Sequence, residues 1–292
     1  MRRLIVNADD FALTTGVNRA IVEAHNAGIV TSASMMANGV ALESAVQLGR
    51  ANPRLGVGCH VVLVDGNPVL PAEDVASLVA DHPAGSAFVN TLSTFAGRSL
   101  LGRLDPAQIE AEAIAQFRKL QSSGLRLTHF DTHKHTHIVP SVTQALLLAA
   151  GKCGIRAVRN PFVPSWPWLL TSFLGRPRLW RRYLEVRALR SFASAFRRKV
   201  KRAGLATTDG ILGVVVTGVL DERWFETIIA AMPEGTWEFV CHPGYNDDDL
   251  GRAQTRLRAS REDELHLLTS QFARDVLARH GVELICFQDL AA

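Results

Sequence analysis

Short apolar runs alternate with longer helical patterns along most of the chain. Runs of this length, flanked by turn residues, are typical of buried strands. We expect strands at 4–8, 30–37, 55–64, 127–131, 157–159, 212–217, 238–241 and 283–287. We expect helices at 17–27, 43–51, 106–122, 141–151, 222–231 and 261–280. This repeated pattern predicts an α/β fold with a parallel sheet, open or closed into a barrel, and seven or eight strands would fit a barrel.

Polar residues follow the predicted strands at several separate places. Because functional groups of parallel α/β folds gather at the carboxyl ends of the strands, we expect these side chains to converge on one site. The residues are Asp9, Asp10, His60, Asp131, His133, Arg159 and His242.

These residue types suit a metal-dependent hydrolase, which needs about three protein ligands, an open position for water, a base and an acid. Asp10, His60 and His133 would make a site of two histidines and one aspartate. Asp9, if its strand is extended, points differently from Asp10 and could deprotonate the bound water. His242 arrives from a distant strand and could protonate the leaving group.

A run of four histidines with one aspartate, "THFDTHKHTH" at 128–137, is the densest cluster of metal-capable groups. If the segment is extended, the side chains of His129, Asp131, His133, His135 and His137 all point the same way. Alternate residues of a strand are about 6.6 Å apart, so these groups cannot all bind one ion. We expect one on the metal, another near the substrate and the others in structural positions. Arg159 could orient or tune a carboxylate.

Other interpretations of these residues remain open. Paired acids are more often a cap or a solvated turn, and a single histidine such as His60 is more often structural. Cys59 and Cys241 each precede a proposed site histidine, but strand alternation turns them away, so we expect them to pack in the core.

The composition is that of an ordinary globular protein, with 292 residues, 47% hydrophobic and 21% charged. We expect one domain over 1–292. The apolar run at the N-terminus is too short for a secretory signal, and no run approaches the length of a spanning helix. The four cysteines form no C-x-x-C pair, so a cytoplasmic protein with reduced thiols is expected.

The net charge of +4 is unevenly distributed. The segment 161–205 carries nine arginines and two lysines against one acid, together with tryptophan and phenylalanine, and its part 178–202 is expected to be helical. Cations mixed with aromatic residues suit an anionic membrane surface. A helical lid on the barrel is the alternative and is compatible with it. Nucleic acid is not expected as a partner, because no recognised module surrounds these charges.

At the level of whole motifs, the chain resembles the YdjC-like carbohydrate deacetylase family. The resemblance rests on "LIVNADDF", "GIVTSASMMANG", "VGCHVVLVDGNPV", "THFDTHKHTHIVP", "CHPGY" and the C-terminal stretch from "SREDEL" onward, in that order. The chain departs from the family at Ala12, where glycine is frequent, and in "GCHVV", where Gly-Leu-His-Leu is more usual.

The resemblance implies a deformed (β/α) barrel of seven or so parallel strands, a divalent metal and hydrolysis of the N-acetyl group of an amino sugar. It carries metal binding to Asp10, His60 and His133, the general base to Asp9 and the general acid to His242. We also expect His135, Arg159 and Tyr245 to contact the substrate. Two imidazoles favour zinc over magnesium, whereas relatives are often associated with magnesium.

The basic insertion makes the chain similar to the hopanoid-biosynthesis branch of the family. That resemblance implies removal of acetyl from an N-acetylglucosaminyl group on a hopanoid lipid, at the inner face of the cytoplasmic membrane. Two alternatives are a deacetylase of soluble chito-oligosaccharides and a non-catalytic metal- or membrane-binding protein. A metallophosphoesterase would usually hold two metals and more carboxylates. A homo-oligomer is compatible with all of these.

Overall fold

The computed structural model describes residues 1–80, 87–166 and 177–290. Its centre is a parallel sheet in which eight strands follow the order β6-β5-β4-β3-β2-β1-β8-β7, and a ninth strand, β9, also pairs with β1. The strands are β1 (Arg2–Phe11), β2 (Ser32–Met35), β3 (Gly56–Val61), β4 (Phe130–Thr132), β5 (Ala157–Val158), β6 (Ala206–Thr207), β7 (Gly210–Leu212), β8 (Gly235–Cys241) and β9 (Val282–Leu284). The predicted parallel α/β architecture is therefore confirmed.

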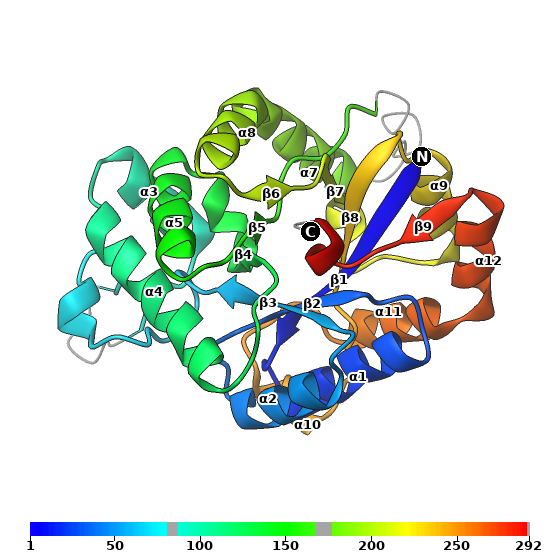
Figure 1. Ribbon diagram of the computed structural model, residues 1–292, viewed down its shortest axis with the longest axis horizontal. Coiled ribbons are helices and arrows are strands. Elements are labelled where there is room, and N and C mark those ends of the chain that lie inside the picture. The colour runs from blue at the N-terminus through cyan, green and yellow to red at the C-terminus, as the bar shows by residue number, and fades with distance from the viewer. Residues whose placement is uncertain (81–86, 167–176, 291–292) are drawn as a thin grey trace.

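The sheet curls into a nearly closed, deformed barrel (Figure 1). The two edge strands, β6 and β7, follow each other in sequence with only residues 208 and 209 between them. Beyond β5 the chain continues alongside them. The Asn160 side chain donates to the Thr208 carbonyl at 2.9 Å, and Ile211 N–H donates to the Phe162 carbonyl at 3.0 Å. These bonds tie the two edges together where no regular ladder does.

Helices cover the outside of the barrel (Figure 1). They are α1 (Thr15–Asn26), α2 (Leu42–Ala51), α3 (Leu92–Leu100), α4 (Pro106–Ser122), α5 (Pro140–Lys152), α9 (Glu222–Ala230), α10 (Asp248–Arg252), α11 (Ala259–Thr269) and α12 (Gln271–Arg279). Four 3₁₀ segments, η1 (Ala72–Val75), η2 (His133–Ile138), η3 (Arg190–Phe192) and η4 (Val214–Val216), lie between them. The short helix α13 (Phe287–Leu290) instead lies at one end of the barrel, where Phe287 packs with Ile5.

Most predicted elements are present with bounds shifted by a few residues, and three differ more clearly from the structure. The single helix expected over 261–280 is two helices, because Ser270 has extended backbone and its side chain caps α12. The strand expected over 212–217 stops at Leu212, since Gly213 has a φ of 85° and the chain then turns into η4. The last strand ends at Leu284, and Phe287 begins α13.

The strand β1 shows how the barrel separates its two faces. Leu4, Val6 and Ala8 belong to the main core cluster beneath the helices, whereas Ile5 packs inside the barrel with Phe287 of α13. Because side chains alternate along a strand, the next inward positions are Asn7 and Asp9. The barrel interior therefore changes along its axis from an apolar plug to a polar layer beneath the strand ends.

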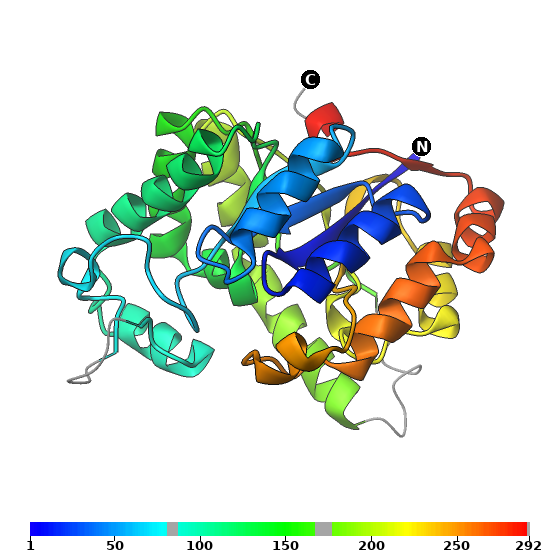
Figure 2. The ribbon, with the colours of Figure 1, turned by 90° about the horizontal axis from the view of Figure 1, so that it is seen from below.

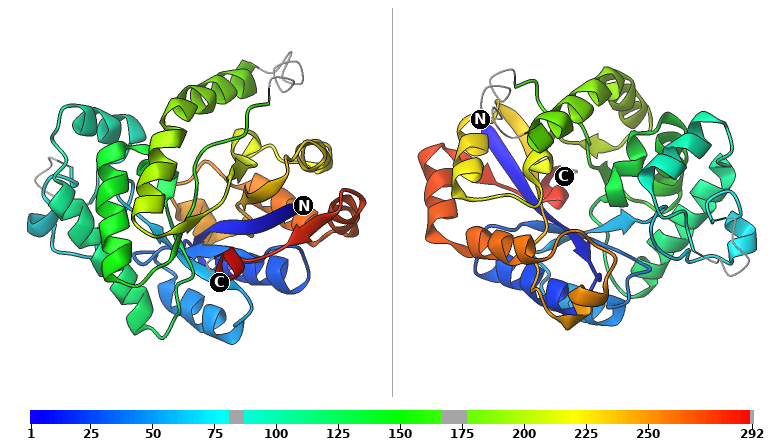
Figure 3. Two further views of the ribbon diagram at one scale, coloured as in Figure 1. Left: turned by 45° about the horizontal axis from the view of Figure 1, so that its top comes forward. Right: turned by 180° about the vertical axis from the view of Figure 1, so that it is seen from behind.

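The basic insertion forms α7 (Pro177–Leu189), η3 and α8 (Ala193–Arg202), so the helix expected over 178–202 is confirmed except for one 3₁₀ turn. Figure 3 shows α8 lying beside α5. Phe196 of α8 is buried and its ring lies 5.6 Å from that of Phe162. Arg182 of α7 donates to the carbonyls of Val215 and Thr217. The stretch 167–176, which includes Trp168 and Phe173 of the predicted basic aromatic segment, lies outside the described residues.

The amino and carboxyl ends of the chain lie at the same end of the barrel (Figure 2). Arg2 begins β1 and pairs with Val282 of β9, whereas Asp9 and Asp10 come at the far end of β1. In the part of the chain that the structure describes, no helix combines the length and apolar character needed to cross a membrane.

Candidate metal and active site

The polar residues expected at the strand ends do meet at one place. Asp10 lies one residue before the end of β1, His60 lies in β3 and His133 starts η2 just after β4. All three line an open cleft of about 880 Å³ at the carboxyl end of the barrel, together with Asp9 and His242. The cleft thus gathers side chains from β1, β3, the end of β4 and the end of β8.

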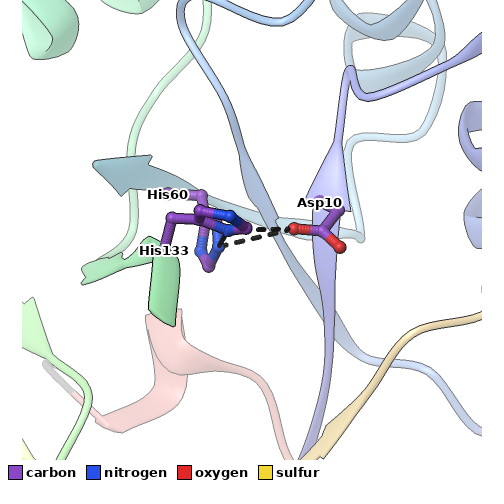
Figure 4. Close-up of side chains that lie close together, drawn as sticks. All are labelled: Asp10, His60 and His133. Atoms are coloured by element: carbon purple, nitrogen blue, oxygen red, sulfur yellow. Dashed lines mark hydrogen bonds and ion pairs between the residues drawn. The ribbon is translucent and has the colours of Figure 1, made fainter. Parts of the chain in front are cut away.

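Three ligand atoms of this cluster form a compact triangle (Figure 4). Asp10 Oδ1 lies 3.6 Å from His60 Nε2 and 3.4 Å from His133 Nδ1, and the two nitrogens are 3.3 Å apart. Ligands about 2.0–2.1 Å from a tetrahedral zinc ion would be about 3.3 Å from one another. The residues present therefore fit one small divalent ion.

A bulge in β1 explains how two consecutive aspartates reach the same cleft. The register between β1 and β2 shifts between Ala8 and Phe11, and Asp10 has a φ of 66°. A bulge of this kind re-aims a side chain that strict alternation would send to the other face. Asp9 and Asp10 thus both line the cleft, although they point differently.

The other atoms of two candidate ligands are held by buried partners. His60 and Asp131 are cross-strand neighbours, and His60 Nδ1 lies 2.7 Å from Asp131 Oδ1. A ring that donates Nδ1–H to a carboxylate leaves Nε2 free for an ion. Asp10 is held in the same way, because Arg261 Nη2 donates to its Oδ2 at 2.5 Å and leaves Oδ1 facing the histidines.

The charges favour a cation at this point. Burial would lower the pKa of His60, but Asp131, Asp9 and Asp10 together raise it to about 9. Burial would also raise the pKa of Asp10, yet Arg261 and His133 hold it well below its usual range. The site therefore stabilises a positive charge between an ionised carboxylate and the imidazoles.

Asp9 is held beside the triangle but outside it. Arg159 donates to both of its oxygens, at 2.6 and 2.9 Å, and the Asn7 side chain donates to Oδ1 at 3.0 Å. Burial would raise the pKa of Asp9, but Arg159 lowers it below its usual range. Asp9 is thus an ionised carboxylate at the wall of the cleft.

Arg159 lies behind the site, fully buried among three carboxylates. Besides Asp9 it contacts Asp131 at 2.6 Å and Glu238 at 2.7 Å. Burial raises the pKa of Glu238 to about 7 despite this contact. A second group of close acids and histidine, Asp9, His60 and Asp131, is a poorer metal site, because Arg159 already neutralises two of its members.

His242 stands next to Asp9 because Ala8 and Cys241 are paired in the sheet. Its Nε2 lies 4.0 Å from Asp9 Oδ2, and its Nδ1 is buried without a hydrogen-bond partner among the described residues. Its backbone N–H donates to Glu264 at 2.6 Å. Burial lowers the pKa of His242 even though Glu264 opposes the shift. The imidazole is therefore placed to exchange a proton inside the cleft.

The prediction that the histidine run is one extended face is wrong. The strand β4 ends at Thr132, and Lys134 and His135 both have a φ of 54°, which ends the alternation. His129 lies inside the barrel, stacked on Phe287 with ring centroids 3.7 Å apart, and burial lowers its pKa to about 3. His137 contacts the Thr132 hydroxyl at 2.6 Å.

His135 and Tyr245 end up in different surroundings. His135 lines the cleft, where burial lowers its pKa to about 3. Tyr245 instead donates its hydroxyl to Glu23 and lies 5.0 Å from the Arg19 guanidinium, both on α1, and it is not among the cleft-lining residues.

The two cysteines beside site histidines are buried. The Cys241 thiol donates to the Asn7 carbonyl at 3.4 Å. Neither Cys59 nor Cys241 belongs to a group of metal-capable side chains among the described residues, which agrees with their expected place in the core.

Sequence reasoning missed Arg261, Glu238 and Asn7. Arg261 lies in α11, within a helical pattern where a basic residue usually marks the solvated face, and no local signal shows that it reaches Asp10. Asn7 and Glu238 could have been found, because each occupies an inward position of a strand that ends at the site.

A family model described as YdjC-like protein matches residues 3–279. The chain belongs to the YdjC-like family. Several curated relatives of this YdjC-like protein are carbohydrate deacetylases. The one from Brevibacillus brevis is 31% identical over 99% of both chains. A carbohydrate deacetylase of Oceanobacillus iheyensis is 38% identical over 92% of this chain and 96% of its own length. A human carbohydrate deacetylase is 33% identical over 99% of this chain and 91% of its own length.

A solved structure supports the fold of this YdjC-like protein. It is a protein of Enterococcus faecalis V583 with the provisional name of a cellobiose-phosphate cleavage protein. The two superpose with a TM-score of 0.78 at 24% identity, over 100% of this chain and 99% of the other. At this identity the likeness establishes the shared architecture alone.

Proposed function

We propose that this protein is a metal-dependent hydrolase that removes the N-acetyl group from an amino sugar. Carbohydrate deacetylation, the hydrolysis of an amide, is the activity that the family and the curated relatives support. The observation that carries the metal dependence is the triangle of Asp10, His60 and His133. Two imidazoles in this set favour zinc, and magnesium is the alternative.

The proposed roles follow from where the side chains lie. A divalent ion held by Asp10, His60 and His133 would polarise the amide carbonyl and acidify a water molecule. Asp9 accepts a proton from the attacking water, because it is ionised, lines the cleft and stays outside the triangle. Arg159 keeps that carboxylate oriented from behind.

His242 completes the proposed reaction as the acid. It lines the cleft beside Asp9 and donates a proton to the nitrogen of the departing amino sugar, which leaves acetate and a free amine. His135 is proposed to contact the sugar from the turn after His133. The cleft wall near α7 would then surround the rest of the substrate.

For the substrate, we propose an N-acetylglucosaminyl group on a hopanoid lipid, with residues 161–205 contacting an anionic membrane. The support is that α7 reaches the cleft through Arg182 and Val186, while Leu184 and Phe192 are 44% and 45% exposed beside cationic residues. Exposed apolar groups among cations suit a lipid surface.

A soluble chito-oligosaccharide is the second candidate substrate. It is favoured by the close docking of α7 and α8 on the barrel, which suits a fixed wall of the cleft. Both candidates require the same metal, base and acid, so they differ only in what surrounds the sugar.

Acetate release from both substrates, with and without a chelator, tests the proposal. We expect chelator-sensitive release from the lipid-linked sugar, stimulated by anionic vesicles at low salt. Release from chito-oligosaccharides alone would favour the second candidate. A protein that releases acetate from neither, with its metal bound, would contradict the proposed activity.

A further inference from the structure

The cleft gathers residues with an unfavourable backbone conformation. Among the described residues, the non-glycine residues with a left-handed backbone are Asp10, Ala12, Asp65, Lys134 and His135. All of these except Ala12 line the cleft. Residues with a Cβ atom adopt this conformation only where their surroundings hold them in it, and such positions cluster at functional sites.

Two of these residues are bound to each other. Lys134 Nζ donates to Asp65 Oδ2 at 2.6 Å, and the two side chains are 33% and 15% exposed. Their φ angles are 54° and 59°, and 69 residues separate them in sequence. The Lys134–Asp65 ion pair therefore joins two strained positions from different loops.

The ion pair also links the loop after β3 to η2, which follows β4, and a candidate ligand lies next to each end of the pair in sequence. Asp65 lies in the loop after β3, which holds His60, and Lys134 directly follows His133. The loop around Asp65 is fixed, because Asp65 N–H donates to the Val89 carbonyl at 2.9 Å. Lys134 is thus attached to a part of the cleft wall that is itself anchored.

The three candidate ligands differ in how they are supported. Asp131 holds the second ring nitrogen of His60, and Arg261 holds the second oxygen of Asp10. Across the described chain, no side chain or carbonyl binds the second ring nitrogen of His133. Apart from the contacts of its Nδ1 with Asp10 and His60, the ring is oriented through its backbone, which turns sharply at the next two residues.

We propose that the Lys134–Asp65 ion pair is the positioning element for His133. By holding the left-handed turn that follows His133, it keeps Nδ1 directed at Asp10 and His60 and so raises the affinity of the site for its ion. This inference rests on the metal site of the proposed function. Neither Lys134 nor Asp65 needs to touch the metal.

Lys134→Met is the decisive variant, because two explanations predict opposite results. Removing a cation near a metal site should strengthen metal binding if only charge mattered. If the ion pair positions His133, the variant should instead bind zinc about 10- to 100-fold more weakly, as loss of supporting partners does in metal sites. Zinc affinity is measured by competition with a chelating dye, on metal-free protein.

Further variants complete the experiment. Asp65→Asn should weaken zinc binding by a similar factor, and the double variant should be no weaker than either single one. Lys152→Met breaks the ion pair between α5 and Glu110 of α4 and should leave the affinity unchanged. If Lys134→Met does not fold, Lys134→Gln provides the same comparison with a polar side chain.

The outcomes separate this inference from the proposed function. Wild-type protein that binds no divalent ion would overturn both. Wild-type binding with unchanged or stronger affinity in Lys134→Met would overturn the positioning role alone. Substitution of Zn²⁺ by Co²⁺ gives a second readout, because its visible spectrum should change in Lys134→Met and remain unchanged in Lys152→Met.

Discussion

Arg261 donates to Oδ2 of Asp10 at 2.5 Å, across 251 residues of sequence. The two side chains are 1% and 7% exposed. Arg261 also donates from Nε to the Leu257 carbonyl at 3.3 Å. One guanidinium thus fixes both the orientation of a candidate metal ligand and the loop that precedes α11.

Arg261→Met should destabilise the protein strongly, because it removes the permanent positive charge that faces the buried Asp10 carboxylate. Loss of one member of a buried pair typically costs about 3–5 kcal/mol, and urea unfolding of metal-free protein measures the change. Arg252→Met is the matched control, since it breaks an exposed pair with Asp249 and should cost less than about 1 kcal/mol. Equal effects of the two variants would contradict the buried role.

Asp9→Asn should remove most activity without removing the metal. The variant keeps Asp10, His60 and His133, so zinc content after dialysis should match that of wild type. Loss of the proposed proton acceptor should slow acetate release by about 10²–10⁴-fold. Wild-type release rates in Asp9→Asn would show that another group acts as base.

Binding of the ion should stabilise the fold. An ion that binds only the folded state at about 100 times its dissociation constant adds about 2.7 kcal/mol to the free energy of unfolding. We expect zinc to raise the unfolding midpoint of wild type after chelator treatment and to leave His133→Ala almost unchanged. An equal shift of the unfolding midpoint in wild type and His133→Ala would show that zinc binds at a site that does not include His133.

Ala12→Gly should cost much less stability than an ordinary buried alanine-to-glycine substitution. Ala12 has a φ of 84°, and its N–H donates to the Asn18 side chain at 2.7 Å, so the turn is fixed. Relief of about 1–2 kcal/mol of backbone strain offsets the entropic cost of glycine, about 0.5–1 kcal/mol, and the loss of a buried methyl group, about 0.8 kcal/mol. Ala37→Gly, at a buried position outside this conformation, should be destabilising, and thermal unfolding compares the two.

His129 should make the protein sensitive to acid. Burial lowers its pKa from 6.5, the ordinary value expected in the unfolded chain, to about 3 in the folded protein, so below pH 6.5 the unfolded chain binds the extra proton. Stability from the neutral ring is complete above pH 6.5 and is lost as the pH falls toward 3, by about 1.4 kcal/mol per pH unit. His129→Phe should reduce this slope in urea unfolding between pH 6 and about pH 4. An unchanged slope would exclude His129 as its source.

The sequence was informative where function follows from strand order. The proximity of Asp10, His60 and His133 could be predicted, because parallel strands place their carboxyl ends on one side of the barrel. The alternation of side chains along strands also correctly predicted that Cys59 and Cys241 are buried in the core. The role of each site residue remains a prediction that the variants above test.

Alternation failed where the backbone leaves the extended region. The histidine run could not be placed, because Lys134 and His135 adopt a left-handed backbone that no residue type in the run indicates. Arg261 could not be found for a related reason. Its partner is fixed by tertiary packing, and no periodic pattern in α11 distinguishes a buried arginine from a solvated one.

The position of the termini has a practical consequence. The start of β1 and the helix α13 lie at the same end of the barrel (Figure 2), opposite the end of β1 whose Asp9 and Asp10 line the cleft. A tag or linker added at either end would therefore attach the protein to a sensor surface or bead with its cleft facing the solution. The cleft would then stay accessible to large or vesicle-bound ligands.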